Sequence, residues 1–209
     1  MSIHHTPFNN YIFVTNRHLS VRPFLSQIEV LCRVHPRAIV LREKDLSEEE
    51  YRKLAEPVLK ICAEHDVPCV LHNFLPAAMA CSDAGLPLAG IHLSLQKLKE
   101  AQRVIAACEE EGIQNNGQFM IGCSVHAPEE AEEAEKLGAS YLFAGHVYAT
   151  DCKKGLPSRG TGFLRDVCDA VHIPVYAIGG IRLDDREQMR EVLECGASGA
   201  AVMSACMQM

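Results

Sequence analysis

Short runs of apolar residues alternate with longer stretches of mixed apolar and polar residues from one end of the chain to the other. This alternation is typical of repeated strand-helix units, which build parallel sheets. Several of the apolar runs are almost continuous, as expected for strands that have helices on one side and a filled interior on the other. We predict eight strands, at Tyr11–Thr15, Ala38–Leu41, Pro68–Leu71, Gly90–Leu93, Phe119–Gly122, Tyr141–Ala144, Val175–Ile178 and Gly199–Val202.

Seven helical segments are predicted between these strands. The clearest is Ser47–His65, which begins with a capping-box pattern, and the next is Pro128–Leu137, in which acidic residues follow a first-turn proline. The pattern predicts one α/β domain over residues 1–209, a (β/α)8 TIM barrel that lacks the last helix because few residues follow the last strand. A doubly wound open sheet is the structural alternative.

Composition and charge exclude several classes of protein to which this chain could belong. Hydrophobic residues make up 48% and charged residues 22% of the chain, which argues against disorder, and a net charge of −7 disfavours a nucleic-acid partner. We find neither an apolar run of about 18 residues nor a leader pattern, so we expect no membrane association and a cytoplasmic location. The ten cysteines form no CxxC pair, which argues against a zinc site or a disulfide framework.

Glycine-rich and polar segments follow the last two predicted strands. In a TIM barrel the active site is built from the loops after the strands, and the seventh and eighth loops commonly bind phosphate through main-chain N–H groups. Gly179-Gly180 and Met203-Ser204 occupy these two loops, so we predict that they bind a phosphate. The alternative is a simple tight turn and a polar terminus.

Two histidines follow predicted strands at the same end of the barrel. An imidazole can both take and return a proton near neutral pH. His126 is therefore a candidate catalytic residue, and His146 is a second acid/base or lining candidate. The alternative for His126 is a histidine at a helix start that bonds to the backbone. His92 lies inside an apolar run and is interpreted as a core or barrel-interior residue.

Cationic residues at the same end could hold an anionic ligand. Arg42 and Lys44 follow the second strand, and Lys153 lies in the loop after the sixth. We expect Glu43 to point outward or to pair with one of its neighbours. Cys152 is interpreted as a residue that lines the site. The alternative for the Lys153 loop is a solvated basic segment.

Several of these segments together resemble a known family. Leu41-Arg42-Glu43-Lys44, Ser124-Val125-His126, the stretch from Gly145 to Leu156, Ala177-Ile178-Gly179-Gly180-Ile181 and Ala201-Val202-Met203-Ser204 occur in an order that resembles the thiamine phosphate synthase/TenI superfamily. The third of these segments, preceded by the second, is similar to the TenI branch, the thiazole tautomerases. The resemblance implies a phosphate-binding barrel that acts in thiamine biosynthesis.

The synthase branch joins a pyrimidine diphosphate to a thiazole phosphate. The resemblance implies Mg²⁺ for that reaction, held by aspartates after the third strand and in the loop after the fourth. This chain has Asn73 and Lys97 near those positions, and Val40 and His146 also depart from the synthase pattern. An amide and a cation are poor ligands for a hard divalent ion. We therefore expect no metal and no cofactor; Mg²⁺ would be needed only if the synthase alternative holds.

The tautomerase reaction requires fewer functional groups than the synthase reaction. The resemblance implies a substrate that is a small phosphorylated thiazole, a dihydro carboxythiazole phosphate, which becomes aromatic when one proton moves from the ring to an exocyclic carbon. His126 would move the proton, and Lys153 or Arg42 would pair with the carboxylate. The alternatives are the synthase itself and a non-catalytic ligand-binding member of the family. The missing helix would expose apolar surface that a second copy could cover, so a homodimer is a further hypothesis.

Overall fold

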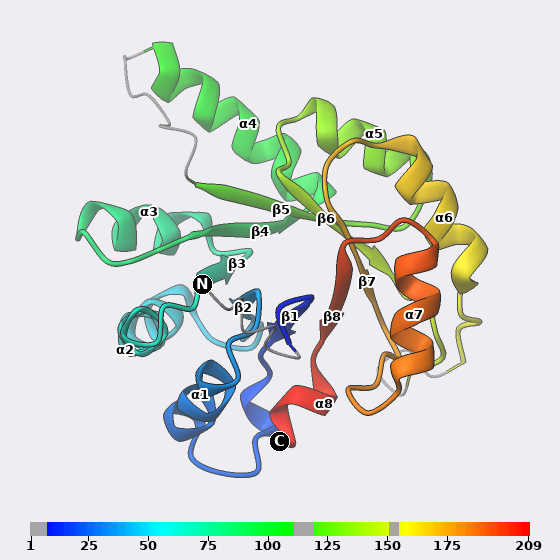
Figure 1. Ribbon diagram of the computed structural model, residues 1–209. Helices are drawn as coiled ribbons and strands as arrows, with labels where there is room; N and C mark the ends of the chain where they lie inside the picture. The colour runs from blue at the N-terminus through cyan, green and yellow to red at the C-terminus, as the bar shows by residue number, and fades with distance from the viewer. Residues whose placement is uncertain (1–7, 111–118, 151–154) are drawn as a thin grey trace, which may run out of the picture.

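Eight parallel strands close into a barrel that is surrounded by helices (Figure 1). The computed structural model describes residues 8–110, 119–150 and 155–209, without the side chains of 103–110. Each strand pairs with the next one along the chain, and the first strand pairs with the last to complete the ring. The predicted TIM barrel is therefore confirmed, and the open sheet is excluded.

All eight predicted strands are present. They are β1 Tyr11–Val14, β2 Ala38–Leu41, β3 Cys69–His72, β4 Gly90–Ser94, β5 Met120–Val125, β6 Tyr141–Gly145, β7 Val175–Ile178 and β8 Gly199–Val202. The strands β3 to β6 run one to three residues beyond their predicted ends. The prediction stopped where the apolar run stopped, whereas β3, β4 and β5 continue with His72, Ser94 and Ser124, polar residues that border a cavity, and β6 continues with Gly145.

The helices follow the strands in order. They are η1 Arg17–Leu19, α1 Phe24–Arg33, α2 Glu48–Glu64, α3 Leu75–Asp83, α4 Leu95–Glu110, α5 Pro128–Lys136, α6 Gly160–Ala170, α7 Arg186–Glu194 and α8 Ser204–Met207. The predicted capping box of α2 is confirmed, because the Ser47 hydroxyl accepts from the Glu50 N–H and the Glu50 carboxylate accepts from the Ser47 N–H. None of the helices in the described part of the chain has both the length and the apolar character needed to cross a bilayer.

The prediction for the segment after the last strand was wrong. We expected no helix after the last strand, but a single turn, α8, follows β8. Cys206 and Met207 of this turn are buried, and this burial favours the turn although it is short. The side-chain amide of Gln27 in α1 donates a 3.1 Å hydrogen bond to the carbonyl of Cys206, which connects α8 to the first helix.

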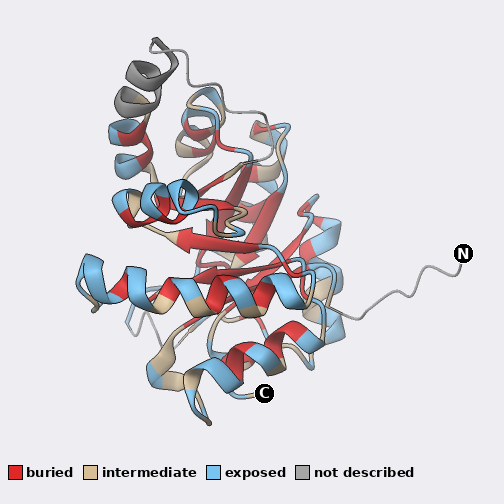
Figure 2. Cartoon of the chain, turned by 90° about the vertical axis from the view of Figure 1, so that its left-hand side faces the viewer, coloured by how far each residue is buried: buried red, intermediate tan, exposed pale blue. Residues whose placement is uncertain are grey.

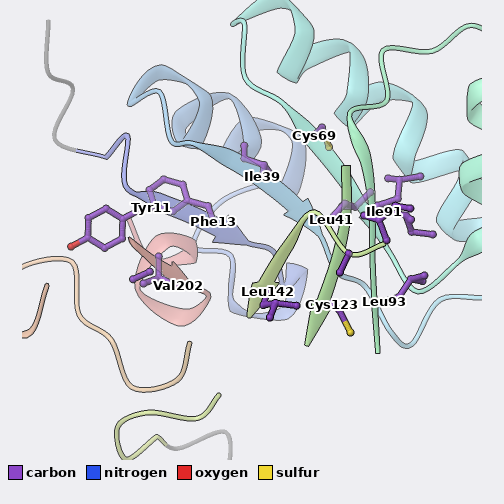
Figure 3. Close-up of a cluster of buried hydrophobic side chains, with 14 of the residues drawn as sticks. Tyr11, Phe13, Ile39, Leu41, Cys69, Ile91, Leu93, Cys123, Leu142 and Val202 are labelled. Carbon is purple, nitrogen blue, oxygen red and sulfur yellow. The ribbon is translucent and has the colours of Figure 1, made fainter. Parts of the chain in front are cut away.

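Side chains that alternate along the strands form two apolar layers. One layer lies between the strands and the helices and includes Phe13, Leu41 and Leu93; Figure 3 shows a part of it. The other fills the barrel interior and includes Val40 and Tyr141. In Figure 2 the strands are almost entirely buried, and the helices are buried along one side only. The two-residue period of a strand produces this division.

The barrel interior also contains a polar row. His92, Gly122 and Tyr141 are direct partners across β4, β5 and β6. The expectation that His92 is an interior residue is confirmed, since only 1% of it is exposed. A Cβ at Gly122 would lie 2.3 Å from the Tyr141 ring and 2.4 Å from Nδ1 of His92. Glycine at position 122 therefore provides the space in which the two side chains meet.

Replacement of Gly122 by alanine should destabilise the barrel. The added methyl group would overpack the interior, so we expect the free energy of unfolding to fall by about 1–3 kcal/mol. Urea denaturation measures this change. Gly162→Ala is the control, because a Cβ at Gly162 in α6 would have no atom within 4 Å. Equal stability of Gly122→Ala and wild type would contradict the packing described for this row.

Candidate active site

A cavity with a volume of about 390 Å³ opens at the C-terminal ends of the strands. The predicted site residues that the structure describes all line it; these are Arg42, Lys44, His126, His146, Gly179, Gly180, Met203 and Ser204. The other two predicted residues, Cys152 and Lys153, lie outside the described residues. The structure therefore brings together residues from the loops after β2, β5, β6, β7 and β8.

The glycine turn after β7 is held firmly against the loop after β6. Gly179 has a φ of +100° and Gly180 a φ of +71°, both in the left-handed region that favours glycine. A Cβ at Gly179 would lie only 2.5 Å from the Cβ of His146. The Gly179 carbonyl accepts a 3.0 Å hydrogen bond from the Tyr148 N–H, and the Gly180 carbonyl accepts one of 3.0 Å from the Gln188 side chain. The turn can approach the β6 loop this closely because it has no side chains.

His146 is the most buried of the cavity histidines and lies beside this turn. Only 6% of the residue is exposed, and both ring nitrogens are buried. Neither nitrogen has a hydrogen-bond partner within the described part of the chain. A buried polar group without a partner is costly, and in native proteins it calls for an explanation. Because both nitrogens are closed off in this conformation, a ligand in the cavity would supply one only after the loop after β6 shifts.

His126 lies at the edge of the same cavity in a different environment. Its side chain is 45% exposed, and its Nδ1 is 3.5 Å from a carboxylate oxygen of Glu130. The backbone N–H of His126 donates a 2.6 Å hydrogen bond to the same carboxylate. The residue thus precedes helix α5 and contacts its first turn, which is close to the alternative that we considered for it.

The prediction for the side chain of Glu43 was wrong. It neither points outward nor pairs with Arg42 or Lys44, but is buried, with 2% of the residue exposed. Its carboxylate accepts hydrogen bonds from the Thr15 hydroxyl at 2.7 Å and from the backbone and guanidinium of Arg17 at 3.0 to 3.2 Å. The strand alternation continues past the end of β2, so Glu43 lies on the opposite side from Arg42.

Arg42 and Lys44 make one side of the cavity cationic. The Arg42 N–H donates to the Thr15 hydroxyl at 2.9 Å, and its guanidinium lies 3.7 Å from the sulfur of Met203. The described lining contains no aspartate or glutamate. The cavity is therefore suited to an anionic ligand, although the whole chain has a net charge of −7.

The two positions near which the resemblance implies metal-binding aspartates contact each other. The Lys97 ammonium donates a 2.7 Å hydrogen bond to the backbone carbonyl of Asn73. The Asn73 side-chain oxygen accepts at 3.2 Å from the Ser94 N–H. No group of three or more histidine, cysteine, aspartate or glutamate side chains in the described ranges could hold a metal ion. The donor set at these positions does not fit a divalent cation.

Sequence reasoning gave no role to three residues on the floor of the cavity. His72, Ser94 and Ser124 are the last inward-facing residues of β3, β4 and β5, and all three line the cavity. Burial, together with the charges of nearby groups, lowers the pKa of His72 to about 2. Burial lowers the pKa of His92 below it to about 3. Both imidazoles are thus neutral at pH 7. The polar residues at alternate positions near the strand ends were the signal that could have revealed this floor.

The chain matches known proteins over almost all of its length. A family model described as thiamine monophosphate synthase matches residues 11–206. The chain is 32% identical over 196 residues to thiamine-phosphate synthase 2 of Streptococcus pneumoniae serotype 4, covering 93% of this chain and 86% of the relative. It is also 32% identical over 194 residues to the thiamine-phosphate synthase of Pyrococcus abyssi, covering 93% and 84%.

Solved structures also resemble this chain over almost all of its length. The thiamine phosphate pyrophosphorylase of Pyrococcus furiosus superposes with a TM-score of 0.75 at 29% identity, covering 97% of this chain and 89% of that one. The N-acetylmannosamine-6-phosphate 2-epimerase of Clostridium perfringens superposes with a TM-score of 0.61 at 16% identity, covering 99% and 92%. The second similarity concerns the fold alone.

The buried His92 should make stability depend on pH. In the unfolded chain a histidine has a pKa of about 6.5, whereas His92 in the folded protein has a pKa of about 3. The unfolded state therefore binds a proton that the folded state does not, and stability falls as the pH drops from about 6.5 toward 3. For His92 the loss between pH 7 and pH 5 should be about 2 kcal/mol.

Urea denaturation of wild type and His92→Gln at both pH values measures this contribution. The difference between the two pH values should be smaller by about 2 kcal/mol in the variant. His35→Asn is the control, because His35 is exposed and asparagine tolerates its left-handed backbone. An unchanged pH difference in His92→Gln would refute the assignment of this proton to His92.

Proposed function

This chain belongs to the thiamine monophosphate synthase family, and we propose that it acts within that family as a thiazole tautomerase of thiamine biosynthesis. The enzyme would convert a dihydro carboxythiazole phosphate to the aromatic 2-(2-carboxy-4-methylthiazol-5-yl)ethyl phosphate. The observation that carries the proposal is the position of His146, a buried imidazole that borders the cavity and packs against the glycine turn.

The substrate phosphate would bind at the loops after β7 and β8. Gly179, Gly180, Met203 and Ser204 line the cavity there, and in barrels of this kind these loops commonly bind phosphate. The absence of carboxylates from the described lining supports this site, because a carboxylate would repel the anion. No metal is needed in this proposal.

His146 would transfer the proton. In the product, the phosphate ends a two-carbon arm, and the first carbon of that arm is the exocyclic carbon that must gain the proton. A phosphate bound at the glycine turn therefore places this carbon close to the turn, and His146 packs against Gly179. One imidazole nitrogen, opened to the cavity by a shift of the loop after β6, would take the proton from the ring carbon and deliver it to the exocyclic carbon, with no net change in charge. Aromaticity of the product supplies the driving force.

The cations would stabilise the charge that develops between the two steps. When the proton leaves the ring carbon, negative charge spreads over the ring, and a nearby fixed cation lowers the energy of that state. Arg42 and Lys44 line the cavity and are suited to this role. Lys153 was also predicted for it, but that residue lies outside the described residues.

The second candidate function is that of the named relatives, the synthase reaction. Identity of 32% over 93% of the chain to a thiamine-phosphate synthase favours it. The contact between Lys97 and Asn73 argues against it, because an ammonium group lies near the position at which the resemblance implies a metal-binding carboxylate. We therefore propose the tautomerase as the first candidate, with no step that requires a metal ion.

The first test follows the tautomer conversion by ultraviolet absorbance without added metal. We expect wild type to accelerate the conversion, and His146→Gln to lower kcat by about 10²–10⁴-fold, the usual contribution of a general acid–base group. The matched variant His126→Gln should lower kcat by less than about tenfold, because this exposed residue would only border the site. Product binding should persist in both variants.

Two results would change the assignment. If His126→Gln abolishes turnover and His146→Gln does not, the proton transfer belongs to His126, as the sequence predicts. If wild type binds the product but does not accelerate the conversion, the protein is a ligand-binding member of the family and the tautomerase proposal fails.

The second test addresses the synthase reaction directly. We expect no thiamine phosphate when wild type is incubated with the pyrimidine diphosphate, the thiazole phosphate and Mg²⁺, because the donor set near Asn73 does not fit the ion. The Pyrococcus furiosus protein serves as the reference sample. Formation of product that depends on Mg²⁺ would restore the synthase as the function of this chain.

A further inference from the structure

Side chains continue the connection between β1 and β2 beyond the ends of the two strands. The backbone register between them ends one residue before Thr15. The Thr15 hydroxyl then accepts a 2.9 Å hydrogen bond from the Arg42 N–H. The Glu43 carboxylate accepts from the Arg17 N–H at 3.0 and 3.1 Å. The segment that carries two cations of the cavity is thus held from the side of the loop after β1.

The Arg17 guanidinium contacts two carboxylates of this segment at once. One terminal nitrogen is 3.2 Å from Oε2 of Glu43 and 2.6 Å from Oδ1 of Asp45, and the other is 2.5 Å from Oδ2 of Asp45. Two parallel bonds to one carboxylate fix its direction as well as its distance. Hydrogen bonds from Arg17 and then from His18 hold the pKa of the Asp45 carboxyl well below its usual range.

The four residues 42–45 alternate both in charge and in direction. Arg42 and Lys44 line the cavity, whereas Glu43 and Asp45 contact Arg17 in the loop after β1. An ion pair between neighbours in this segment is the competing arrangement, and it was one of the two expected for Glu43 from the sequence. Arg17 favours the observed arrangement, because the buried Glu43 carboxylate would be costly without a cationic partner.

A bound anion gains from this separation of charges. A carboxylate paired with Arg42 would offset the attraction between that cation and the anion. Arg42 lies beside the loop after β8, since its guanidinium is 3.7 Å from the sulfur of Met203, a lining residue of the predicted phosphate site. A cation that is already held in place also needs no reorganisation when the anion arrives.

We propose that Arg17 is a positioning residue of this site, which holds Glu43 and Asp45 away from the cavity so that Arg42 and Lys44 stay directed to a bound anion. Arg17 is not one of the described residues that line the cavity, so it acts through the two carboxylates. The inference rests on the proposed function for the identity of the natural ligand, whereas the ion pairs of Arg17 are a property of the protein alone.

The first experiment measures the binding of inorganic phosphate by ³¹P NMR titration. Arg17→Gln should weaken it by about tenfold, because the released carboxylates compete with phosphate for the two cations. Arg190→Gln is the matched control and should leave the affinity unchanged. Arg190 in α7 also contacts two carboxylates, those of Glu187 and Glu194, and it is not a described lining residue. Unchanged affinity in Arg17→Gln, or no phosphate binding by wild type, would overturn the proposal.

Removal of the two carboxylates should restore the affinity. The triple variant combines Arg17→Gln with Glu43→Gln and Asp45→Asn, so no carboxylate of the segment remains to compete. Its affinity for phosphate should return to within about twofold of wild type. The amide oxygen introduced by Glu43→Gln can still accept from the Thr15 hydroxyl. Urea denaturation verifies that the variant is folded, and a folded triple variant that binds as weakly as Arg17→Gln would contradict the role of the carboxylates.

A third comparison separates ion pairing from a general effect of charge, and it does not depend on the triple variant. When Arg42→Gln and Lys44→Gln are already present, Arg17→Gln should weaken phosphate binding by less than about twofold more, because the cations that the carboxylates would capture are gone. An effect of charge from a distance would persist in this background. A full further loss would therefore rule out the positioning role.

Failure of the tautomerase proposal gives a different result. Wild type would then show no turnover of the dihydro carboxythiazole phosphate, while phosphate binding and its dependence on Arg17 would remain as described.

Discussion

The structure depends on the pairing of β1 with β8, which turns a row of parallel strands into a closed ring. Once the ring is closed, every strand has one face toward the helices and one toward a narrow interior. The interior can accept only a limited volume of side chain. Its residues are therefore both a core and the floor of the cavity, and the glycine at 122 is required by the two side chains beside it.

Closure also explains how a protein with a net charge of −7 presents a cationic cavity. Most of the acidic residues in the described ranges lie on the helices, and none of those residues lines the cavity. Glu43 is the instructive case, because it is next to Arg42 in sequence but points away from the cavity and holds the loop after β1. Its carboxylate is neutralised by Arg17, so it does not oppose an anion bound on the other side.

Much of the fold could be predicted, because strand and helix periods depend on local patterns of apolar residues. The predicted strands lie within a few residues of their actual positions, and the interior place of His92 followed from the apolar run around it. The burial of Glu43 and its pairing with Arg17 could not be predicted, since Arg17 comes from a different loop. The difference in burial between His126 and His146 was equally hidden, because it depends on the contact of His146 with Gly179 between the ends of the neighbouring strands β6 and β7.

The hydrogen bond between Gln27 and the carbonyl of Cys206 joins residues that are 179 positions apart, and the pairing of Tyr11 with Ala200 spans a similar separation. Contacts of this range are slow to form, because the entropy of closing a long loop must be overcome before they contribute. During synthesis, one edge of β1 must therefore stay unpaired until β8 has left the ribosome. An unpaired strand edge is a template for association with other chains. The interval before closure is thus the period in which this protein is most exposed to aggregation.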